Sequence, residues 1–130
     1  RGTKREHIIR AAQESIAYQV ADLVRAMEAD MGGAITQLKA DGGASRDHFL
    51  MQFQADVIGR AVYRPAIRET TALGAAYLAG LAVGLWANRS EIKALWKCDN
   101  TYQPAMSTER RDRLLADWHK AVGRCKDWTK

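Results

Sequence analysis

The sequence has few cysteines and few prolines, two of each in 130 residues. Cys98 and Cys125 cannot build a disulfide-dense scaffold, and neither belongs to a CxxC pair. The three histidines, His7, His48 and His119, are scattered, so no spacing indicates a zinc site. Such sparse cysteine use is typical of a reducing compartment. We therefore expect a cytoplasmic protein whose two thiols are free.

Long hydrophobic runs are also missing. The most apolar stretch, residues 72–87, has sixteen residues without a charge, whereas a membrane span needs about 20. We therefore expect no membrane span, and we expect this run, rich in Ala and Gly, to form a buried helix. Gly80 and Gly84 have the GxxxG spacing, which allows a helix to pack closely against its neighbour.

The composition that remains is that of an ordinary globular domain, 47% hydrophobic and 27% charged, with a net charge of +5. Much of the basic excess falls in residues 108–130. We interpret it as a solvated helical face, because no RNP motif and no interleaving of aromatic and basic residues indicates a nucleic-acid partner.

Periodicity and capping signals divide the chain into helices and two short strands. Thr3 and Glu6 have the spacing of a capping box, and an apolar stripe follows it. The stripe consists of Ile9, Ala12, Ile16, Val20, Leu23, Met27 and Met31. The predicted elements are a helix to Met31, a strand at 34–40, a helix at 46–58, a strand at 61–64, a helix from Thr70 or Thr71 to Trp86, helical turns at 90–97, and after a loop a last helix from Ser107 or Thr108.

This order predicts an α/β fold, rich in helix, with an incomplete sheet. Two short strands do not make a stable sheet, and a parallel pair is normally covered on both faces. We expect the missing strands to come from an N-terminal part or from another chain. Because unpaired strand edges favour association, we also expect a homo-oligomer.

The strongest local signal is the junction from Asp41 to Ser45, where Gly42 and Gly43 stand between a strand and a helix. Glycines let the backbone approach a ligand closely, and the helix that follows directs N–H groups at the turn. Ligands bind at the carboxyl ends of strands in doubly wound folds. A tight strand-to-helix turn with a helix cap explains the same residues equally well.

Four carboxylates, those of Asp41, Asp47, Asp56 and Glu69, are conceivable acid–base groups. Asp47 is more simply explained as the partner of a helix dipole, and His48 as a packing or surface residue. No Ser-His-Asp or Cys-His arrangement follows from the spacing, so we assign no catalytic residue.

A longer series of residues around this turn resembles the C-terminal domain of the glycerol kinases, within the FGGY family of carbohydrate kinases. The matching segments are Asp41-Gly42-Gly43-Ala44, residues 49–56, Arg64-Pro65, Glu69 and residues 71–84, together with residues 7–14 near the start of the chain.

The resemblance implies the later part of an actin- and ribonuclease-H-like ATPase domain, with residues 1–130 forming a partial C-terminal domain with a mixed sheet. It implies that Gly43 and Asp47 contact the nucleotide on its adenosine side and that Gly42 shapes the turn. Glycerol kinases usually have Asn-Asn or Asn-Asp where this chain has Asp47-His48. An amide donates and accepts hydrogen bonds, whereas an ionised carboxylate only accepts.

By the same resemblance, the whole enzyme would use ATP and Mg²⁺ to phosphorylate glycerol. The phosphate-binding hairpin, the glycerol-binding residues, the catalytic aspartate and the parts that mainly hold Mg²⁺ would lie upstream of the matching segment. A xylulose or gluconate kinase of the same family is an alternative. A non-catalytic interaction module derived from the kinase domain is another.

Overall fold

The computed structural model describes residues 2–127 and has an α/β fold with a small mixed sheet. The elements in chain order are α1 (Arg5–Met31), β1 (Gln37–Lys39), the 3₁₀ helix η1 (Gly43–Arg46), α2 (His48–Ile58), β2 (Ala61–Pro65), α3 (Thr70–Ala82), α4 (Arg89–Ala94), β3 (Cys98–Tyr102) and α5 (Thr108–Cys125). The expected fold class, including the mixed sheet, is confirmed.

The sheet has the strand order β1-β2-β3. β1 and β2 are parallel, with Leu38 opposite Val62. β3 pairs antiparallel with β2, with Val62 opposite Tyr102. The sequence analysis expected a loop in place of β3, and this was wrong. β3 is a polar edge strand in which only Tyr102 is buried, so its sequence carries no alternation of apolar residues.

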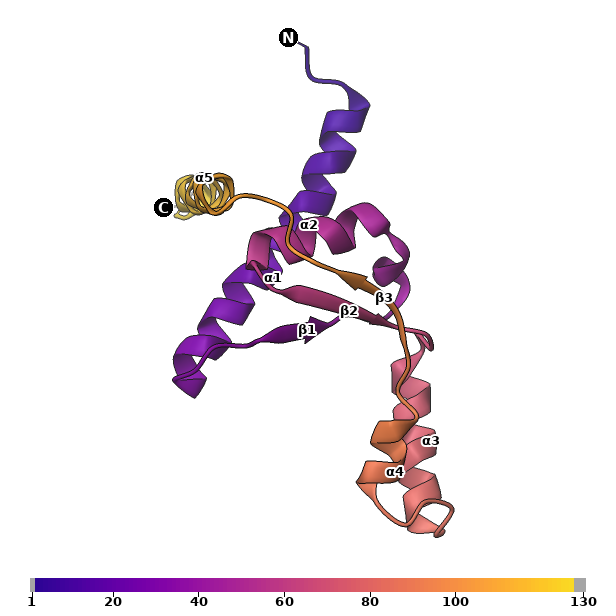
Figure 1. Cartoon of the computed structure of the whole chain (residues 1–130). Helices are drawn as coiled ribbons and strands as arrows, with labels where there is room; N and C mark the ends of the chain where they lie inside the picture. The colour runs from indigo at the N-terminus through magenta and orange to yellow at the C-terminus, as the bar shows by residue number, and fades with distance from the viewer. Residues whose placement is uncertain (1, 128–130) are drawn as a thin grey trace.

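Helices α1, α2 and α5 lie on one side of the sheet, and α3 and α4 extend from the far end of β2 on the other side (Figure 1). The core lies between α1, α2 and β2. Its members include Tyr18, Phe53 and Val62. Tyr18 meets the edge of the Phe53 ring at 5.5 Å and stacks on Trp118 of α5 at 5.4 Å between ring centroids. These rings therefore join all three helices.

Polar contacts also hold α5 against α1. Asp22 accepts hydrogen bonds from Trp118 Nε1 at 2.7 Å and pairs with His119 Nε2 at 2.6 Å. Burial opposes the ionisation of Asp22, but the hydrogen bonds from His119 and Trp118 outweigh it and lower the pKa of that carboxyl. At the start of α5, Ser107 accepts from the Arg110 N–H, as its expected role as a cap requires.

The apolar stripe by which the sequence predicts helix α1 is mostly exposed, so it is not the face of the helix that meets the core. Ile16, Leu23 and Met31 are each at least 45% exposed. The buried face presents Ala17, Tyr18, Ala21 and Val24. Small residues are favoured there because they let α2 approach closely. The cap was misassigned: Lys4 is the N-cap, and its N–H donates to His7 Nδ1 at 3.0 Å.

Helix α3 was expected to be buried and to reach Trp86, but it ends at Ala82 and buries only Gly80. The other residues of the helix are half-buried, such as Leu73 and Tyr77, or exposed. The Trp86 ring folds back onto Gly80, so a Cβ there would collide with it. Gly80 therefore allows close packing against a side chain of the following turn, whereas the sequence predicted a neighbouring helix.

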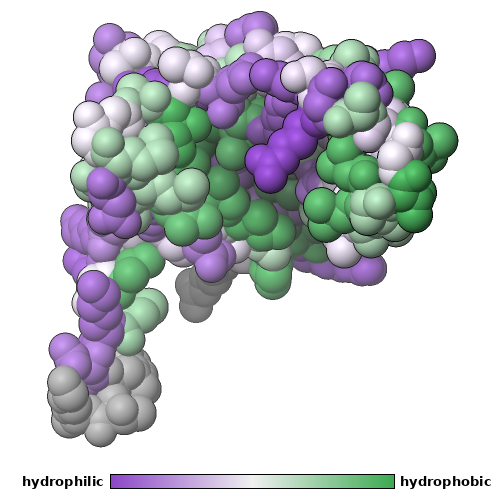
Figure 2. Space-filling model, turned by 90° about the horizontal axis from the view of Figure 1, so that it is seen from below, coloured by the Kyte–Doolittle hydropathy of each residue, from purple (hydrophilic) through white to green (hydrophobic). Residues whose placement is uncertain are grey.

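Hydrophobic side chains gather on the face that α3 and α4 share, at the right of Figure 2. A cleft of about 560 Å³ opens between the two helices and the ends of β1 and β2. Its lining is mainly apolar, including Leu73, Tyr77 and Trp96. Over residues 2–127, none of the helices combines the length and the apolar character needed to cross a bilayer.

Candidate functional site

The two loops that follow β1 and β2 meet at the carboxyl edge of the sheet. The Gly42 N–H donates to the Arg68 carbonyl at 3.1 Å, and Thr70 Oγ1 donates to the Asp41 carboxylate. Thr70 was expected as a possible N-cap of α3. Instead Glu69 occupies the N-cap position, and its side chain makes no capping bond. The hydrogen bonds of Gly42 and Thr70 attach the candidate turn to the start of α3.

The two glycines of the turn differ in conformation. Gly42 has φ 79° and ψ −176°, a combination that is essentially restricted to glycine. The φ of Gly43 is not in the left-handed region, and a Cβ added there would meet nothing within 4 Å. The fold therefore requires glycine at position 42, whereas no contact within the described residues requires it at position 43.

Asp47 stands at the N-terminus of α2. This is the place that its expected role as the partner of the helix dipole requires. Its Oδ1 accepts from the Leu50 N–H at 3.1 Å, and its Oδ2 accepts from Gln13 Nε2 of α1. The carboxylate thus caps α2 and joins it to α1. At the other end of α2, Gly59 adopts the left-handed conformation, φ 65°, that ends the helix where the sequence predicted.

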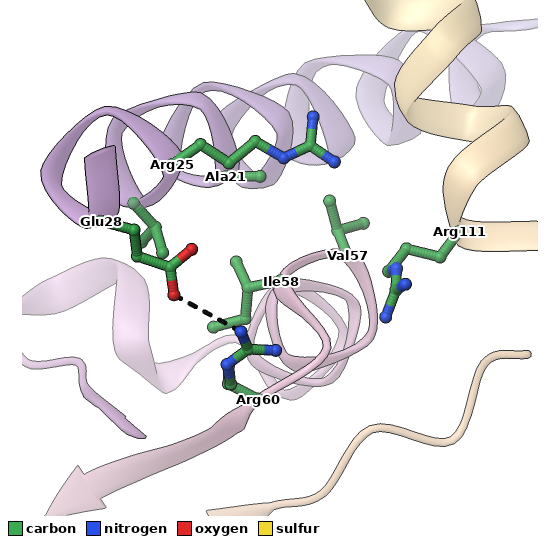
Figure 3. A pocket seen from close by; sticks show the side chains of 8 residues that line it. Ala21, Arg25, Glu28, Val57, Ile58, Arg60 and Arg111 are labelled. Carbon is green, nitrogen blue, oxygen red and sulfur yellow. Dashed lines mark hydrogen bonds and ion pairs between the residues drawn. The ribbon is translucent and has the colours of Figure 1, made fainter. Parts of the chain in front are cut away.

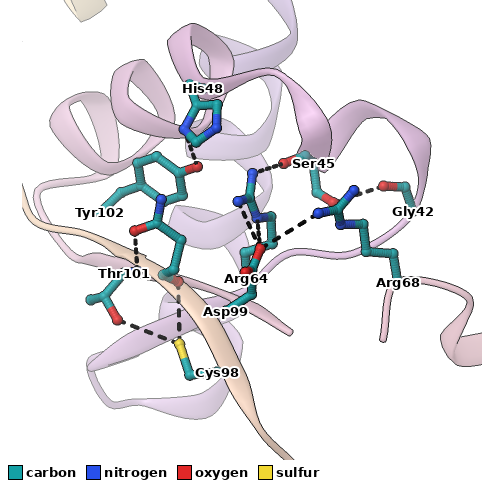
Figure 4. A network of polar contacts seen from close by, with 10 residues as sticks. Gly42, Ser45, His48, Arg64, Arg68, Cys98, Asp99, Thr101 and Tyr102 are labelled. Atoms are coloured by element: carbon teal, nitrogen blue, oxygen red, sulfur yellow. Dashed lines mark hydrogen bonds and ion pairs between the residues drawn. The ribbon is translucent and has the colours of Figure 1, made fainter. Parts of the chain in front are cut away.

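A buried arginine supports the turn from the sheet. Arg64 of β2 is 5% exposed. Its guanidinium lies 2.7 Å from Asp99 of β3 and donates to the Ser45 carbonyl of η1 at 3.2 Å (Figure 4). The Ser45 hydroxyl donates in turn to the Gly42 carbonyl at 2.7 Å. Arg64 therefore connects both of its neighbours, β3 and η1, to the backbone of the turn.

Asp99 also faces Arg68, whose guanidinium lies 3.5 Å away. The hydrogen bond from Arg64 lowers the pKa of the Asp99 carboxyl, and Arg68 adds to the effect. Sequence reasoning missed both Asp99 and the role of Arg64. An arginine inside a predicted strand, next to Pro65, is the one signal that could have identified the buried pair, because such a charge requires a partner.

Asp56, another of the proposed carboxylates, has structural partners. Asp56 Oδ1 accepts from Gln52 Nε2 and from the Ala105 and Met106 N–H groups, which fixes the segment before α5. His48 Nδ1 lies 2.9 Å from Tyr102 Oη, consistent with the packing role expected for it. Between residues 2 and 127, no three His, Cys, Asp or Glu side chains converge in a way that could hold a metal ion.

Comparison with known proteins identifies the family. The C-terminal domain of the FGGY family of carbohydrate kinases matches residues 1–83. A glycerol kinase of Dechloromonas aromatica is 56% identical over 128 residues, which are 98% of this chain and 26% of that protein. The chain thus spans about a quarter of the length of the curated relatives it matches.

Solved structures agree with the sequence relatives. A Plasmodium falciparum glycerol kinase, solved with ADP, superimposes with a TM-score of 0.84 at 36% identity, over 95% of this chain and 25% of that one. A xylulose kinase of Rhodospirillum rubrum gives a TM-score of 0.74 at 28% identity over the same shares. The chain therefore belongs to the FGGY family of carbohydrate kinases.

Proposed function

We propose that this chain supplies the adenosine side of the ATP site in a glycerol kinase. The whole protein would transfer the γ-phosphoryl group of ATP to a glycerol hydroxyl and release glycerol 3-phosphate and ADP. The observation that carries the proposal is the 56% identity to a glycerol kinase over 98% of this chain. The xylulose kinase likeness is weaker in both identity and superposition, so glycerol is favoured as the acceptor.

The geometry of the turn supports a ligand on this edge of the sheet. Gly42 and Gly43 follow the carboxyl end of β1, the place where α/β folds bind ligands. Space is open beside Gly43, so a ligand could contact its backbone directly. We assign Gly43 and Asp47 to contacts with the nucleotide and Gly42 to the shape of the turn.

Besides its assigned contact with the nucleotide, Asp47 would hold the turn in position. Its carboxylate is engaged by Leu50 and Gln13 and fixes the first turn of α2 beside Gly43. Arg64 would act further back, by holding Ser45 and through it the Gly42 carbonyl. Phosphoryl transfer depends on such positioning of the nucleotide against its acceptor.

ATP would bind with Mg²⁺, which offsets the charge of the phosphates. We assign no residue of this chain to the metal, because the described residues bring no cluster of suitable ligands together. We likewise assign no general base here. The part of the kinase that holds glycerol and the base would have to supply both functions.

A hybrid kinase tests the function. In it, this chain replaces the equivalent segment of the Dechloromonas aromatica glycerol kinase. We expect ATP- and glycerol-dependent release of ADP at a rate within about tenfold of the parent enzyme, since the substituted segment would position the adenosine in the same way. The 130-residue chain alone should give no turnover, because we assign it neither a base nor a phosphate clamp.

Two outcomes would contradict the proposal. One is a hybrid that melts cooperatively and binds glycerol but neither binds nor hydrolyses ATP, which would favour an interaction module. The other is a hybrid that binds ATP but in which the parent's preference for glycerol is lost.

The carboxylate of Asp47 gives a second prediction. In the hybrid, Asp47→Asn should raise ATP affinity by about two- to fivefold, because it removes a negative charge near the polyphosphate. The amide oxygen can still accept from the Leu50 N–H and keep the helix cap. Calorimetric titration with ATP measures the change, and Asp117→Asn, on the exposed surface of α5, is the matched control. A large loss of ATP affinity in Asp47→Asn would show instead that the nucleotide needs the carboxylate.

A further inference from the structure

A second, smaller cavity lies at the amino edge of the sheet, at the opposite end of β2 from Gly42. It has a volume of about 160 Å³ and is enclosed by α1, the end of α2 and α5. Figure 3 shows Val57 and Ile58 beside it, with arginines from three different segments around them. These are Arg25 of α1, Arg60 just before β2, and Arg111 of α5.

The residues that line this cavity carry more positive than negative charge. Glu28 is the acidic residue in its lining. Its Oε1 already accepts from the Ile35 N–H at 2.9 Å and lies 3.4 Å from the Arg60 guanidinium. The C-terminal end of α2 contributes about half a negative charge. The lining therefore holds three guanidinium groups and one carboxylate, although two carboxylates outside it also act on these arginines, Asp112 on Arg111 and Asp22 on Arg25.

Two of the three arginines keep free donors. Arg25 makes no hydrogen bond or ion pair with any residue between 2 and 127 that the structure describes. Arg111 uses only its Nε, which donates to Asp112 at 3.1 Å, and so leaves its terminal nitrogens unbonded. Arg60, in contrast, is fixed by its Nε bond to the Ile35 carbonyl at 2.9 Å.

The backbone at the end of α2 makes room for Arg111. A Cβ on Gly59 would lie 2.5 Å from Arg111 Nη1, so glycine allows the guanidinium to sit against the helix end. Packing thus holds the Arg111 guanidinium against the end of α2, in the same cavity lining as Arg60, which carries the same charge. Such an arrangement is favourable when an anion lies between the cations.

We propose that this cavity binds a small phosphate dianion, either inorganic phosphate or the phosphate group of a monoester. Guanidinium groups hold phosphate oxygens through paired hydrogen bonds, and the free donors of Arg25 and Arg111 are placed to supply them. The cavity admits a phosphate group but not a nucleotide, and it lies away from the Gly42 turn. The site is therefore separate from the proposed ATP site, and its test does not depend on that site.

Titration calorimetry of the 130-residue chain at constant ionic strength tests the proposal, with inorganic phosphate and glycerol 3-phosphate in separate arms. We expect saturable 1:1 binding that Arg25→Gln/Arg111→Gln weakens at least tenfold. The matched control, Arg5→Gln/Arg113→Gln, removes two exposed arginines from the same two helices and should bind like the unmodified chain. Whichever of the two ligands binds more tightly shows whether the site takes inorganic phosphate or the phosphate group of a monoester.

If phosphate binding weakens equally in the two double variants, the proposal is wrong, because the loss would then depend only on the net charge of the chain. Absence of saturable binding to the unmodified chain would overturn it as well. Circular dichroism establishes that each variant is folded. Should the double variant unfold, the single variant Arg25→Gln, whose side chain makes no hydrogen bond or ion pair with any residue between 2 and 127, must still show weaker phosphate binding.

Discussion

Gly43→Val in the hybrid kinase is expected to weaken ATP binding by about tenfold or more, a loss of at least about 1.4 kcal/mol, with glycerol affinity unchanged. The reason lies in the turn itself. A Cβ at position 43 would point into space that no described residue fills, so the new side chain would occupy the volume assigned to the nucleotide. Calorimetric titration with ATP and with glycerol measures both affinities in one preparation.

Gly42→Ala is the matched comparison for this experiment. Because Gly42 has φ 79°, an alanine there should cost about 1–3 kcal/mol of stability through backbone strain. Gly43→Val should cost only a few tenths of that, since its φ is ordinary. If instead Gly43→Val lowers the melting temperature as much as Gly42→Ala and the folded fraction binds ATP normally, the turn is only a structural cap, and the adenosine-site assignment is wrong.

The parts of the fold that were predictable are those that local chemistry determines. Helix α2 begins at an aspartate that caps it and ends at Gly59, and both signals are in the sequence. β1 lies in a short alternating segment and β2 in a short, mostly apolar one, on either side of that helix, so a parallel pair follows from the order of the elements. These three elements carry the candidate turn, which is why its place in the fold could also be predicted.

The remaining elements depend on contacts that no local pattern reveals. β3 is held by its backbone pairing with β2 and by the Asp99–Arg64 ion pair, and Tyr102 is its one side chain in the core. The apolar periodicity of α1 predicts a helix correctly, but two faces of that helix are apolar, and periodicity does not show which of them meets α2. Helix α3 is apolar on all of its faces, a pattern that is typical of buried helices. In this chain, however, only Gly80 of α3 is buried.

The same distinction holds within the candidate site. The glycine pair marks the turn in the sequence, but the dihedral angles are needed to show that position 42 requires glycine and position 43 does not. Asp47 was predicted as a dipole partner from its place in the first turn. Its bond to Gln13 joins residues 34 positions apart and could not be predicted from spacing.

Replacing the buried Arg64 should have the largest effect on stability. Arg64→Ala is expected to lower the free energy of unfolding by about 2–3 kcal/mol, because it leaves the Ser45 carbonyl without its donor and empties a buried volume. Urea denaturation of the 130-residue chain, followed by circular dichroism, measures the loss. Arg113→Ala, an exposed position on α5, is the control and should change stability by less than about 0.5 kcal/mol.

The pH dependence of this difference separates the ion pair from simple packing. The pKa of Asp99 is lowered in the folded chain by the hydrogen bond from Arg64. A carboxyl whose folded pKa is depressed contributes stability above its unfolded pKa, near 4, and loses that contribution as the pH falls through the folded value. The difference in free energy of unfolding between the unmodified chain and Arg64→Ala should therefore be largest above about pH 5 and decrease steadily below pH 4. A gap that stays constant from pH 7 to pH 3 would mean that Arg64 acts only by filling space and donating to Ser45, and that its pairing with Asp99 adds nothing to the stability of the fold.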